Sequence, residues 1–153
     1  MLLKVSRVHN AAKLPQRANP SDAGADIFYC PKSELNSNIR LEAGQSVVIP
    51  TGIKVEIPHG YMLEVKNRSG VAAKKHLLVG ACVIDSGYSG EIFVNLHNVG
   101  TEVQFIDYGA KVAQLVLIPV VQWRPVEVEE NNLYQDALTI SNRGEGALGS
   151  TGG

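Results

Sequence analysis

The sequence predicts one all-β domain with a single short helix. Short segments rich in β-branched and aromatic residues recur along most of the chain, and Gly, Pro and Asn residues separate them. Residues 61–66 show the period of two expected for a strand with one buried face. Prolines stand at the ends of such segments, where a residue without a backbone N–H is tolerated. This combination is typical of a β-sandwich or β-barrel.

The expected strands follow one another from the N-terminus to residue 129, with turn-forming residues between most of them. They are residues 3–8, 25–29, 46–50, 52–57, 61–66, 77–84, 91–98, 103–106, 112–121 and 126–129. A short helix is expected at residues 69–76, because residues 71–75 tolerate helical structure and Ser69 can cap the first turn.

Composition and charge limit the function classes that fit the chain. It has 153 residues, of which 44% are hydrophobic, and its net charge is −1. A chain of this length buries about two-thirds of its unfolded surface. The balanced charge provides no electrostatic basis for wrapping nucleic acid or lying on an anionic membrane. Cys30 and Cys82 lack a metal-binding spacing, and no signal peptide is recognisable, so we expect reduced thiols in a soluble intracellular protein.

The chain is expected to divide after residue 130. Residues 1–130 form the β domain, and residues 131–153 form a linker and a glycine-rich C-terminal arm. Residues 143–153 contain five glycines and cannot bury enough apolar surface to fold alone, so a flexible arm is expected. It is either a free end or, because it combines Arg, Ser, Thr and unhindered backbone N–H groups, a segment that closes on phosphate oxygens.

Residues 80–91 form the most informative segment. Two β-branched residues precede Asp85, and glycines on both sides flank Tyr88. The pattern predicts a β-hairpin whose tip carries one carboxylate and one aromatic ring. Because glycine lets the backbone approach a flat ligand closely, a binding site is one interpretation. A surface hairpin with a solvated carboxylate is the other.

Three further polar clusters lie at the ends of expected strands. Residues 22–27 place two carboxylates around a glycine just before a strand. Residues 67–70 place a cation and a hydroxyl where a strand meets a helix, and backbone N–H groups at a helix start favour an anion. Residues 111–115 open a strand with a cation and an amide. Each cluster alone is explained by a solvated turn, whereas their joint occurrence in this order indicates a shared site.

Together with the arm, these segments closely resemble the five ordered motifs of the trimeric dUTPase family, the dUTP diphosphatases. The matching segments are residues 22–27, 67–72, 80–98, 111–115 with Pro119, and the Arg-Gly…Gly-Ser-Thr-Gly arm. The resemblance extends over residues 14–152. It implies a dUTPase-like jelly-roll, or distorted β-barrel, with one short helix and a flexible C-terminal arm. It also implies a homotrimer whose three active sites each take residues from all three chains.

The resemblance further implies the reaction. Water would attack the α-phosphate of dUTP with the help of Mg²⁺ and release dUMP and pyrophosphate, which keeps uracil out of DNA and supplies dUMP for thymidylate synthesis. Mg²⁺ would be held by substrate phosphates and waters, with no protein ligand set. The implied partners are dUTP and further copies of the chain, with no nucleic acid or membrane. The implied location is the cytoplasm, or the host cytoplasm for a viral chain, with the nucleus as the alternative.

Catalytic and base-binding roles carry over onto individual residues. Asp85 corresponds to the general base, which must lie within hydrogen-bond reach of the attacking water. Tyr88 would pack against the deoxyribose and leave no room for a 2′-hydroxyl. The backbone of Gly80, Val83 and Ile84 would pair with the uracil edge, while close walls exclude the methyl group of thymine.

Phosphate-binding roles carry over in the same way. Asp26 corresponds to a catalytic carboxylate that supports the water and charge network, and Gln114, Arg68, Ser69 and Gly70 match positions around the phosphates and the water. Preorganised donors of this kind stabilise the charge of a leaving pyrophosphate. The arm residues implied to close over the substrate are Arg143, Gly146, Leu148, Gly149, Ser150 and Thr151.

Three residues depart from the family pattern. Cys82 stands where many relatives have glycine, beside the backbone expected to read the base. Leu148 stands where most relatives place a phenylalanine that stacks on uracil. Ala110 and Lys111 replace a more usual Asp-Arg pair, so one supporting ion pair is expected to be missing.

Two alternative functions remain. One is a dCTP deaminase-like enzyme on the same fold, but that family uses a glutamate beside the base, whereas Asp85 and Tyr88 here follow the dUTPase arrangement. The other is a non-catalytic, regulatory nucleotide-binding protein. The motif residues argue against an inactive enzyme, although they leave room for a second, binding role.

Overall fold

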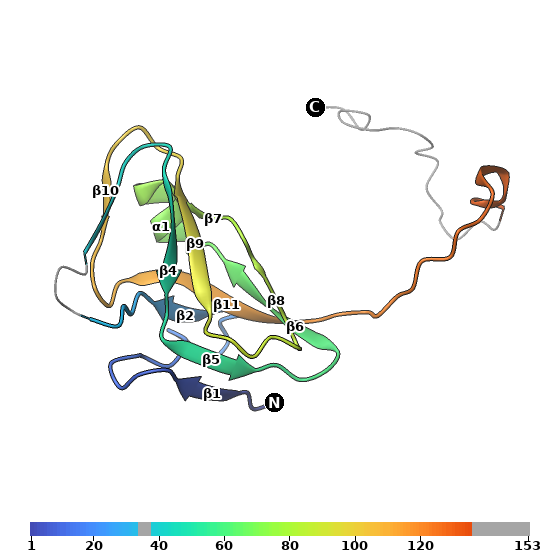
Figure 1. The fold of residues 1–153 in the computed structure, drawn as a ribbon, viewed down its shortest axis with the longest axis horizontal. Coiled ribbons are helices and arrows are strands. Elements are labelled where there is room, and N and C mark those ends of the chain that lie inside the picture. Colours follow the sequence, from blue (N-terminus) through green and yellow to red (C-terminus); the bar gives the residue numbers. More distant parts are fainter. Residues whose placement is uncertain (34–37, 136–153) are drawn as a thin grey trace. The chain divides into compact units, whose positions relative to one another are not determined.

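The computed structural model describes residues 1–33 and 38–135. The chain divides into two compact units, Met1–Gln122 and Trp123–Gly153. In the described part of the first unit, one α-helix, α1 (Ser69–Lys75), accompanies eleven strands (Figure 1). The prediction of an all-β domain with one short helix is therefore confirmed. No helix in the described ranges is long and apolar enough to span a membrane.

A four-stranded antiparallel sheet carries most of the residues of interest. Its strands lie in the order β2 (Ala25–Phe28), β11 (Lys111–Pro119), β6 (Tyr61–Lys66) and β8 (Val83–Asp85). Figure 1 shows the long strand β11 running beside β6. Gln114 of β11 lies opposite both Asp26 of β2 and Lys66 of β6, whereas Asp85 of β8 lies opposite Met62 at the other end of β6.

Three smaller antiparallel sheets complete the first unit. They are β4 (Ser46–Pro50), β9 (Phe93–Asn98) and β7 (Leu77–Val79) in the order β4-β9-β7; β1 (Lys4–Arg7) with β5 (Ile53–Glu56); and β3 (Ile39–Leu41) with β10 (Gln104–Ile106).

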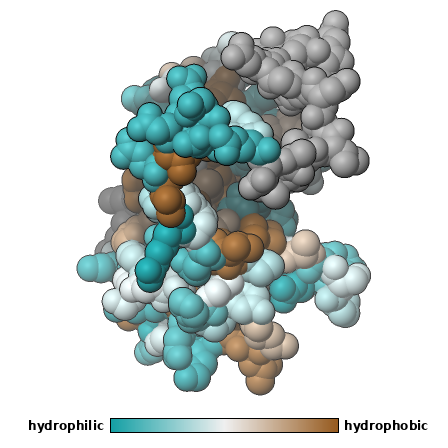
Figure 2. All heavy atoms as spheres, turned by 90° about the vertical axis from the view of Figure 1, so that its right-hand side faces the viewer, coloured by the Kyte–Doolittle hydropathy of each residue, from teal (hydrophilic) through white to brown (hydrophobic). Residues whose placement is uncertain are grey.

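The core is built by alternating side chains on these strands. On β9, Val94 and Leu96 are fully buried, whereas Phe93 is half exposed, so the strand has one inner and one outer face. Ile49 and Ile53 of the neighbouring strands are buried in the same cluster. Figure 2 shows that hydrophobic side chains also reach the surface in several separate places among hydrophilic ones.

The β-hairpin predicted for residues 80–91 is wrong. Strand β8 pairs with β6, whereas β9 pairs with β4 and β7, so the intervening turn crosses between two sheets. The single strand expected at residues 77–84 is likewise two strands, because Gly80, Ala81 and Cys82 interrupt it. The N–H of Gly80 still donates to Asn95 on β9, at 2.9 Å, and the chain then turns toward β6.

Other boundaries also differ from those expected. The strand predicted at residues 126–129 is absent from the structure, since no strand in the described part of the chain pairs with it, and the segment leads to a 3-10 helix, η1 (Glu130–Asn132). The three-residue strand β3 was not predicted. Helix α1 begins after Arg68, with no side-chain cap, so the capping role expected of Ser69 is wrong.

Candidate active site

Asp26 lies at the centre of an ion-pair cluster. Arg68, at the N-cap of α1, places its Nε 2.7 Å from the Asp26 Oδ1, and the Nζ of Lys111 lies 2.9 Å from the Oδ2. Strand β11 brings Lys111 next to β2, where the register shifts between Lys111 and Ala113. The expectation that an ion pair is missing at this position is therefore wrong, because Lys111 forms one with Asp26.

The cluster controls the charge of Asp26. Its side chain is only 13% exposed, and this burial raises the pKa of the carboxyl. Hydrogen bonds from Lys111 and Arg68, together with their positive charges, outweigh burial and hold the pKa below its ordinary value. Asp26 is thus a carboxylate at neutral pH and orients two cations.

Replacing Asp26 by asparagine is expected to lower the free energy of unfolding at pH 7 by about 1.5–3 kcal/mol, because two cations lose their charged acceptor. A carboxyl whose pKa is lowered by folding stabilises the fold above its unfolded pKa, and this contribution disappears as the pH falls through the folded pKa. The difference between wild type and Asp26→Asn should therefore shrink below about pH 4. Denaturant unfolding at several pH values measures it, and a difference that does not change with pH would contradict the assignment.

Gln114 is held in place from two sides. Its Nε2 donates to the backbone oxygen of Asn67 at 2.9 Å. On the other side lies Gly24, where an added Cβ would stand 2.7 Å from the Cδ of Gln114 and overlap its Oε1. The absence of a side chain at residue 24 therefore makes room for the Gln114 amide.

The first pocket brings together five of the predicted site residues. It has a volume of about 340 Å³. Its lining comprises Ala18, Asp22, Ala23, Gly24, Asp26, Arg68, Ser69, Gly70 and Gln114. Cationic, hydroxyl and amide groups line this space together with the carboxylates of Asp22 and Asp26, and these donors suit an anion with several oxygen atoms.

The turn that follows β8 is fixed by its own hydrogen bonds. The N–H of Tyr88 donates to the backbone oxygen of Asp85 at 3.0 Å, and the Tyr88 hydroxyl donates to the backbone oxygen of Glu91 at 2.7 Å. The Glu91 carboxylate accepts the N–H of Gly52 at 2.8 Å and so anchors the turn to the start of β5. Asp85 and Tyr88 both remain exposed.

The second pocket lies between β8 and the start of β9 and has a volume of about 210 Å³. Its lining comprises Val65, Ala81, Val83, Ile84, Asp85, Tyr88, Glu91, Ile92 and Phe93. The walls are mostly apolar, and two carboxylates and one phenol stand among them; the Glu91 carboxylate is already bound to Gly52, which leaves that of Asp85. This composition suits a flat, weakly polar ring with a reactive group at its edge.

Gly80 and Cys82 are placed beside this pocket rather than in its lining. A Cβ at Gly80 would lie 2.9 Å from the Cδ2 of His97, so a side chain at this position would have to displace side chains of β9. Cys82 is half buried, and its backbone oxygen accepts the N–H of Val65 at 2.8 Å. Its carbonyl is therefore hydrogen-bonded to strand β6.

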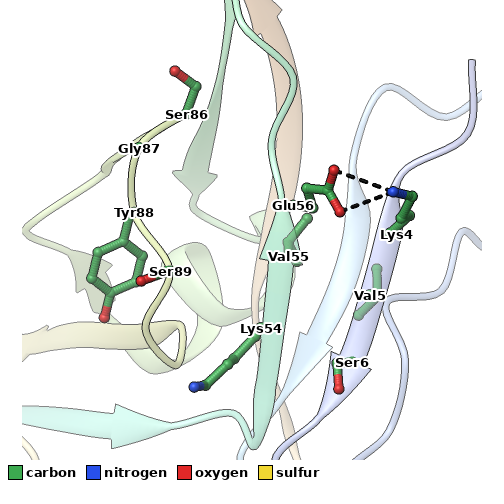
Figure 3. A pocket seen from close by; sticks show the side chains of 10 residues that line it. All are labelled: Lys4, Val5, Ser6, Lys54, Val55, Glu56, Ser86, Gly87, Tyr88 and Ser89. Carbon is green, nitrogen blue, oxygen red and sulfur yellow. Dashed lines mark hydrogen bonds and ion pairs between the residues drawn. The ribbon is translucent and has the colours of Figure 1, made fainter.

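A third pocket, of about 370 Å³, lies behind the turn. Figure 3 shows the turn from Ser86 to Ser89 on one side and strands β5 and β1 on the other, where Lys4 pairs with Glu56 at 3.1 Å. Tyr88 lines both this pocket and the second one. Tyr88 therefore borders both spaces.

Within one chain, the first and second pockets are separate and share no lining residue in the described structure. Asp85 lies opposite Met62 and Gln114 lies opposite Lys66, four residues further along β6, which corresponds to about 13 Å. Two groups that bind one water molecule lie within about 6 Å of each other. A single chain therefore does not bring Asp85 and Gln114 to the same water.

Arg143, Gly146, Leu148, Gly149, Ser150 and Thr151 lie outside the described residues. Within residues 1–33 and 38–135, no group of three His, Cys, Asp or Glu side chains is arranged to hold a metal ion. The roles of Lys111 and Asn67 were not predicted, because they depend on strand register and loop geometry, although Lys111 opens a recognised motif.

The family model, the relative and the solved structure that match this chain are all described as the same kind of protein. The family model described as dUTPase matches residues 10–152. A deoxyuridine 5'-triphosphate nucleotidohydrolase from Chlamydia trachomatis is 38% identical over 148 residues, which cover 95% of each chain. A mutant dUTPase of Staphylococcus bacteriophage 80alpha, solved with dUpNHpp, matches with a TM-score of 0.83 and 28% identity over 99% of both chains.

A second similar solved structure is described as showing a metal ion. A mutant dUTPase from phage phi11 of S. aureus matches with a TM-score of 0.73 and 30% identity, over 85% of this chain and 98% of that chain. That work describes the coordination of a structural Mg(II) ion. The structural matches confirm the fold class expected from the sequence.

Proposed function

The chain belongs to the dUTPase family and shares its reaction, the hydrolysis of dUTP, and on this premise we propose how its residues perform that reaction. Water attacks the α-phosphorus, and dUMP and pyrophosphate leave. Asp85 is the general base that takes a proton from this water. The observation that carries the assignment is the exposed Asp85 carboxylate at the edge of the mostly apolar second pocket.

The second pocket is the proposed site of uracil and deoxyribose. Its volume of about 210 Å³ and its walls of Val83, Ile84 and Phe93 suit a nucleobase with a sugar at its mouth. The Tyr88 ring is held by the bond from its hydroxyl to Glu91, so it cannot easily retreat from an added 2′-hydroxyl. Shape thereby excludes ribonucleotides, and close walls exclude the thymine methyl group.

The first pocket is the proposed phosphate site. Arg68 uses its Nε to hold Asp26, and a guanidinium has five N–H donors, so others remain for phosphate oxygens. The Ser69 hydroxyl, the Gly70 amide and the Gln114 amide line the same pocket. Bonds to Asp26 and Asn67 hold the Arg68 and Gln114 side chains before substrate arrives, and such preorganisation stabilises charge that develops on a leaving pyrophosphate.

The complete site is proposed to form between copies of the chain in a homotrimer. One subunit supplies the first pocket, a second supplies the turn with Asp85 and Tyr88, and the third supplies the arm. The separation of about 13 Å along β6 supports this, because Gln114 and Asp85 can meet at one water only if they come from different copies. Val48 and Phe93, 61% and 46% exposed on neighbouring strands, provide apolar surface for a subunit contact.

Mg²⁺ is the proposed cofactor. The donor set of this chain fits an ion carried by the substrate, since Asp26 is already paired with two cations and Asp22 is the other carboxylate of the first pocket. Mg²⁺ typically binds through substrate phosphates, waters and one or two carboxylates. When bound to the triphosphate, it neutralises part of the phosphate charge.

Residues 1–130 are proposed as the catalytic domain and residues 131–153 as a linker and arm that closes over the phosphates. Closure would exclude water and complete the site only around a triphosphate. The cytoplasm is the proposed location, where the enzyme keeps uracil out of DNA and supplies dUMP.

Replacing Leu148 by phenylalanine is expected to tighten substrate binding. Leucine covers the base without the ring stacking that is worth about 1–3 kcal/mol per base, so the Kd of a non-hydrolysable dUTP analogue should fall by about tenfold. Calorimetric titration measures it, with Leu133→Phe as a matched control outside the arm. An unchanged Kd in Leu148→Phe would show that residue 148 does not cover the base.

A substrate panel tests the proposed function. Pyrophosphate and ammonia release are measured for dUTP, dCTP, dTTP and UTP with the wild-type protein and Mg²⁺. We expect pyrophosphate release from dUTP at a far higher kcat/KM than from dTTP, dCTP or UTP, and no ammonia from any of them. Ammonia from dCTP would instead indicate a deaminase, and no turnover of any nucleotide would indicate a binding protein.

A further inference from the structure

We propose that Asn67 is a positioning residue that holds the phosphate-binding side and the base-binding side of the chain in register. Its side-chain Oδ1 accepts the backbone N–H of Val79 at 2.7 Å, and its backbone oxygen accepts the Nε2 of Gln114 at 2.9 Å. It also directly precedes Arg68. One residue of the 67–72 motif thus contacts Gln114 of the 111–115 motif and Val79, which directly precedes the 80–98 motif. This inference rests on the proposed function.

The bond to Val79 matters because of where β7 leads. On one edge β7 pairs with β9, with Val79 opposite Leu96, and the next N–H, of Gly80, donates to Asn95. In an antiparallel pair, successive N–H groups alternate between the two edges of a strand, so the N–H of Val79 points away from β9. Asn67 occupies that second edge and fixes the end of β7 from the opposite side. The chain beyond Val79 leads directly into the second pocket.

The bond to Gln114 places the same residue in contact with the first pocket. The Gln114 amide is confined between the Asn67 backbone oxygen and Gly24. A shift of residue 67 therefore moves the Gln114 donor together with the loop that carries Arg68. Small displacements of such groups reduce catalysis strongly.

In the proposed homotrimer, the two sides that Asn67 joins serve different active sites. The first pocket of a chain contributes to one site, whereas its turn contributes to a neighbouring one. Asn67 then connects two active sites. It adjoins Arg68 in the chain and binds Gln114 at the phosphate contacts of one site, and through Val79 it holds the segment that leads to the base contacts of the next site.

The test compares Asn67→Ala, Asn67→Asp and the control Gln45→Ala. The aspartate keeps an oxygen that accepts the Val79 N–H. Gln45 makes a matched bond elsewhere, because its Oε1 accepts the backbone N–H of Glu42 at 3.0 Å. The readout is the ratio of kcat/KM for dUTP to that for dTTP. The negative charge of an aspartate weakens the binding of both triphosphates to the same extent, so its effect cancels in this ratio.

We expect Asn67→Ala to lower the ratio by about 2- to 10-fold, the effect of one hydrogen bond. Asn67→Asp should keep the wild-type ratio at a lower kcat/KM for both nucleotides, and Gln45→Ala should match wild type. An unchanged ratio in Asn67→Ala, an equal loss in Asn67→Asp, or failure of Asn67→Ala to fold would overturn the proposal. A wild type that is inactive on dUTP would instead contradict the proposed function itself.

Discussion

Replacing Asp85 by asparagine is expected to lower kcat for dUTP by about 10²- to 10⁴-fold. An amide of the same shape cannot take the proton of the attacking water. The Asp85 carboxylate is exposed at the end of β8 and makes no hydrogen bond or ion pair with the described part of the chain. The substitution should therefore leave folding and assembly unchanged, so the loss should fall on kcat rather than on the binding of a dUTP analogue.

The matched control is Asp107→Asn, an exposed carboxylate that lines none of the three pockets. Single-turnover kinetics on both variants separate the chemical step from product release. An Asp85→Asn protein with more than about a tenth of wild-type kcat would rule out this carboxylate as the general base.

Replacing Gly24 by alanine is expected to lower kcat/KM for dUTP by about 100-fold, the scale of a 1 Å misplacement at a reacting centre. The new Cβ would occupy the space of the Gln114 amide, which must rotate away and lose its bond to Asn67. The atoms in conflict are at the end of a flexible side chain, so the fold itself should adapt. Thermal unfolding should accordingly show little change.

A double-mutant cycle identifies the cause of that loss. If Gly24→Ala acts through Gln114, then adding it to Gln114→Ala should produce almost no further loss, because the displaced amide is already absent. Independent, multiplicative losses would show instead that residue 24 contacts the substrate or shapes the pocket directly.

The local sequence pattern correctly predicted those strands that are defined by the residue types and periodicity within the strand itself. Residues 46–50 and 61–66 were predicted with their observed bounds, since β-branched content and a period of two define them. The hairpin at residues 80–91 was predicted wrongly because local turn residues do not reveal which strand accepts the hydrogen bonds. That choice depends on β6 and β4, which are distant in sequence.

In the candidate site, too, some features could be predicted from the sequence, whereas others depend on strand register and loop packing. The family resemblance identified Asp26, Arg68 and Gln114, and the structure places all three in the first pocket. Lys111 was expected to leave an ion pair missing, but the register shift between β11 and β2 turns its ammonium to Asp26. The link through Asn67 could not be predicted either, because it depends on how the loop before α1 approaches the end of β7.

The separation of the two pockets has a direct functional consequence. If one active site takes its phosphate contacts from one copy and its general base from another, two differently disabled chains can repair each other. Arg68→Ala disables the first pocket while Lys111 still pairs with Asp26, and Asp85→Asn disables the turn.

Mixing these two inactive variants, by refolding them together in equal amounts, tests shared active sites most directly. In random trimers, one site in four combines an intact first pocket with an intact turn, so activity should recover to about a quarter of the wild-type value. Mixed protein with no more activity than the sum of the two variants alone would contradict a site assembled from different chains.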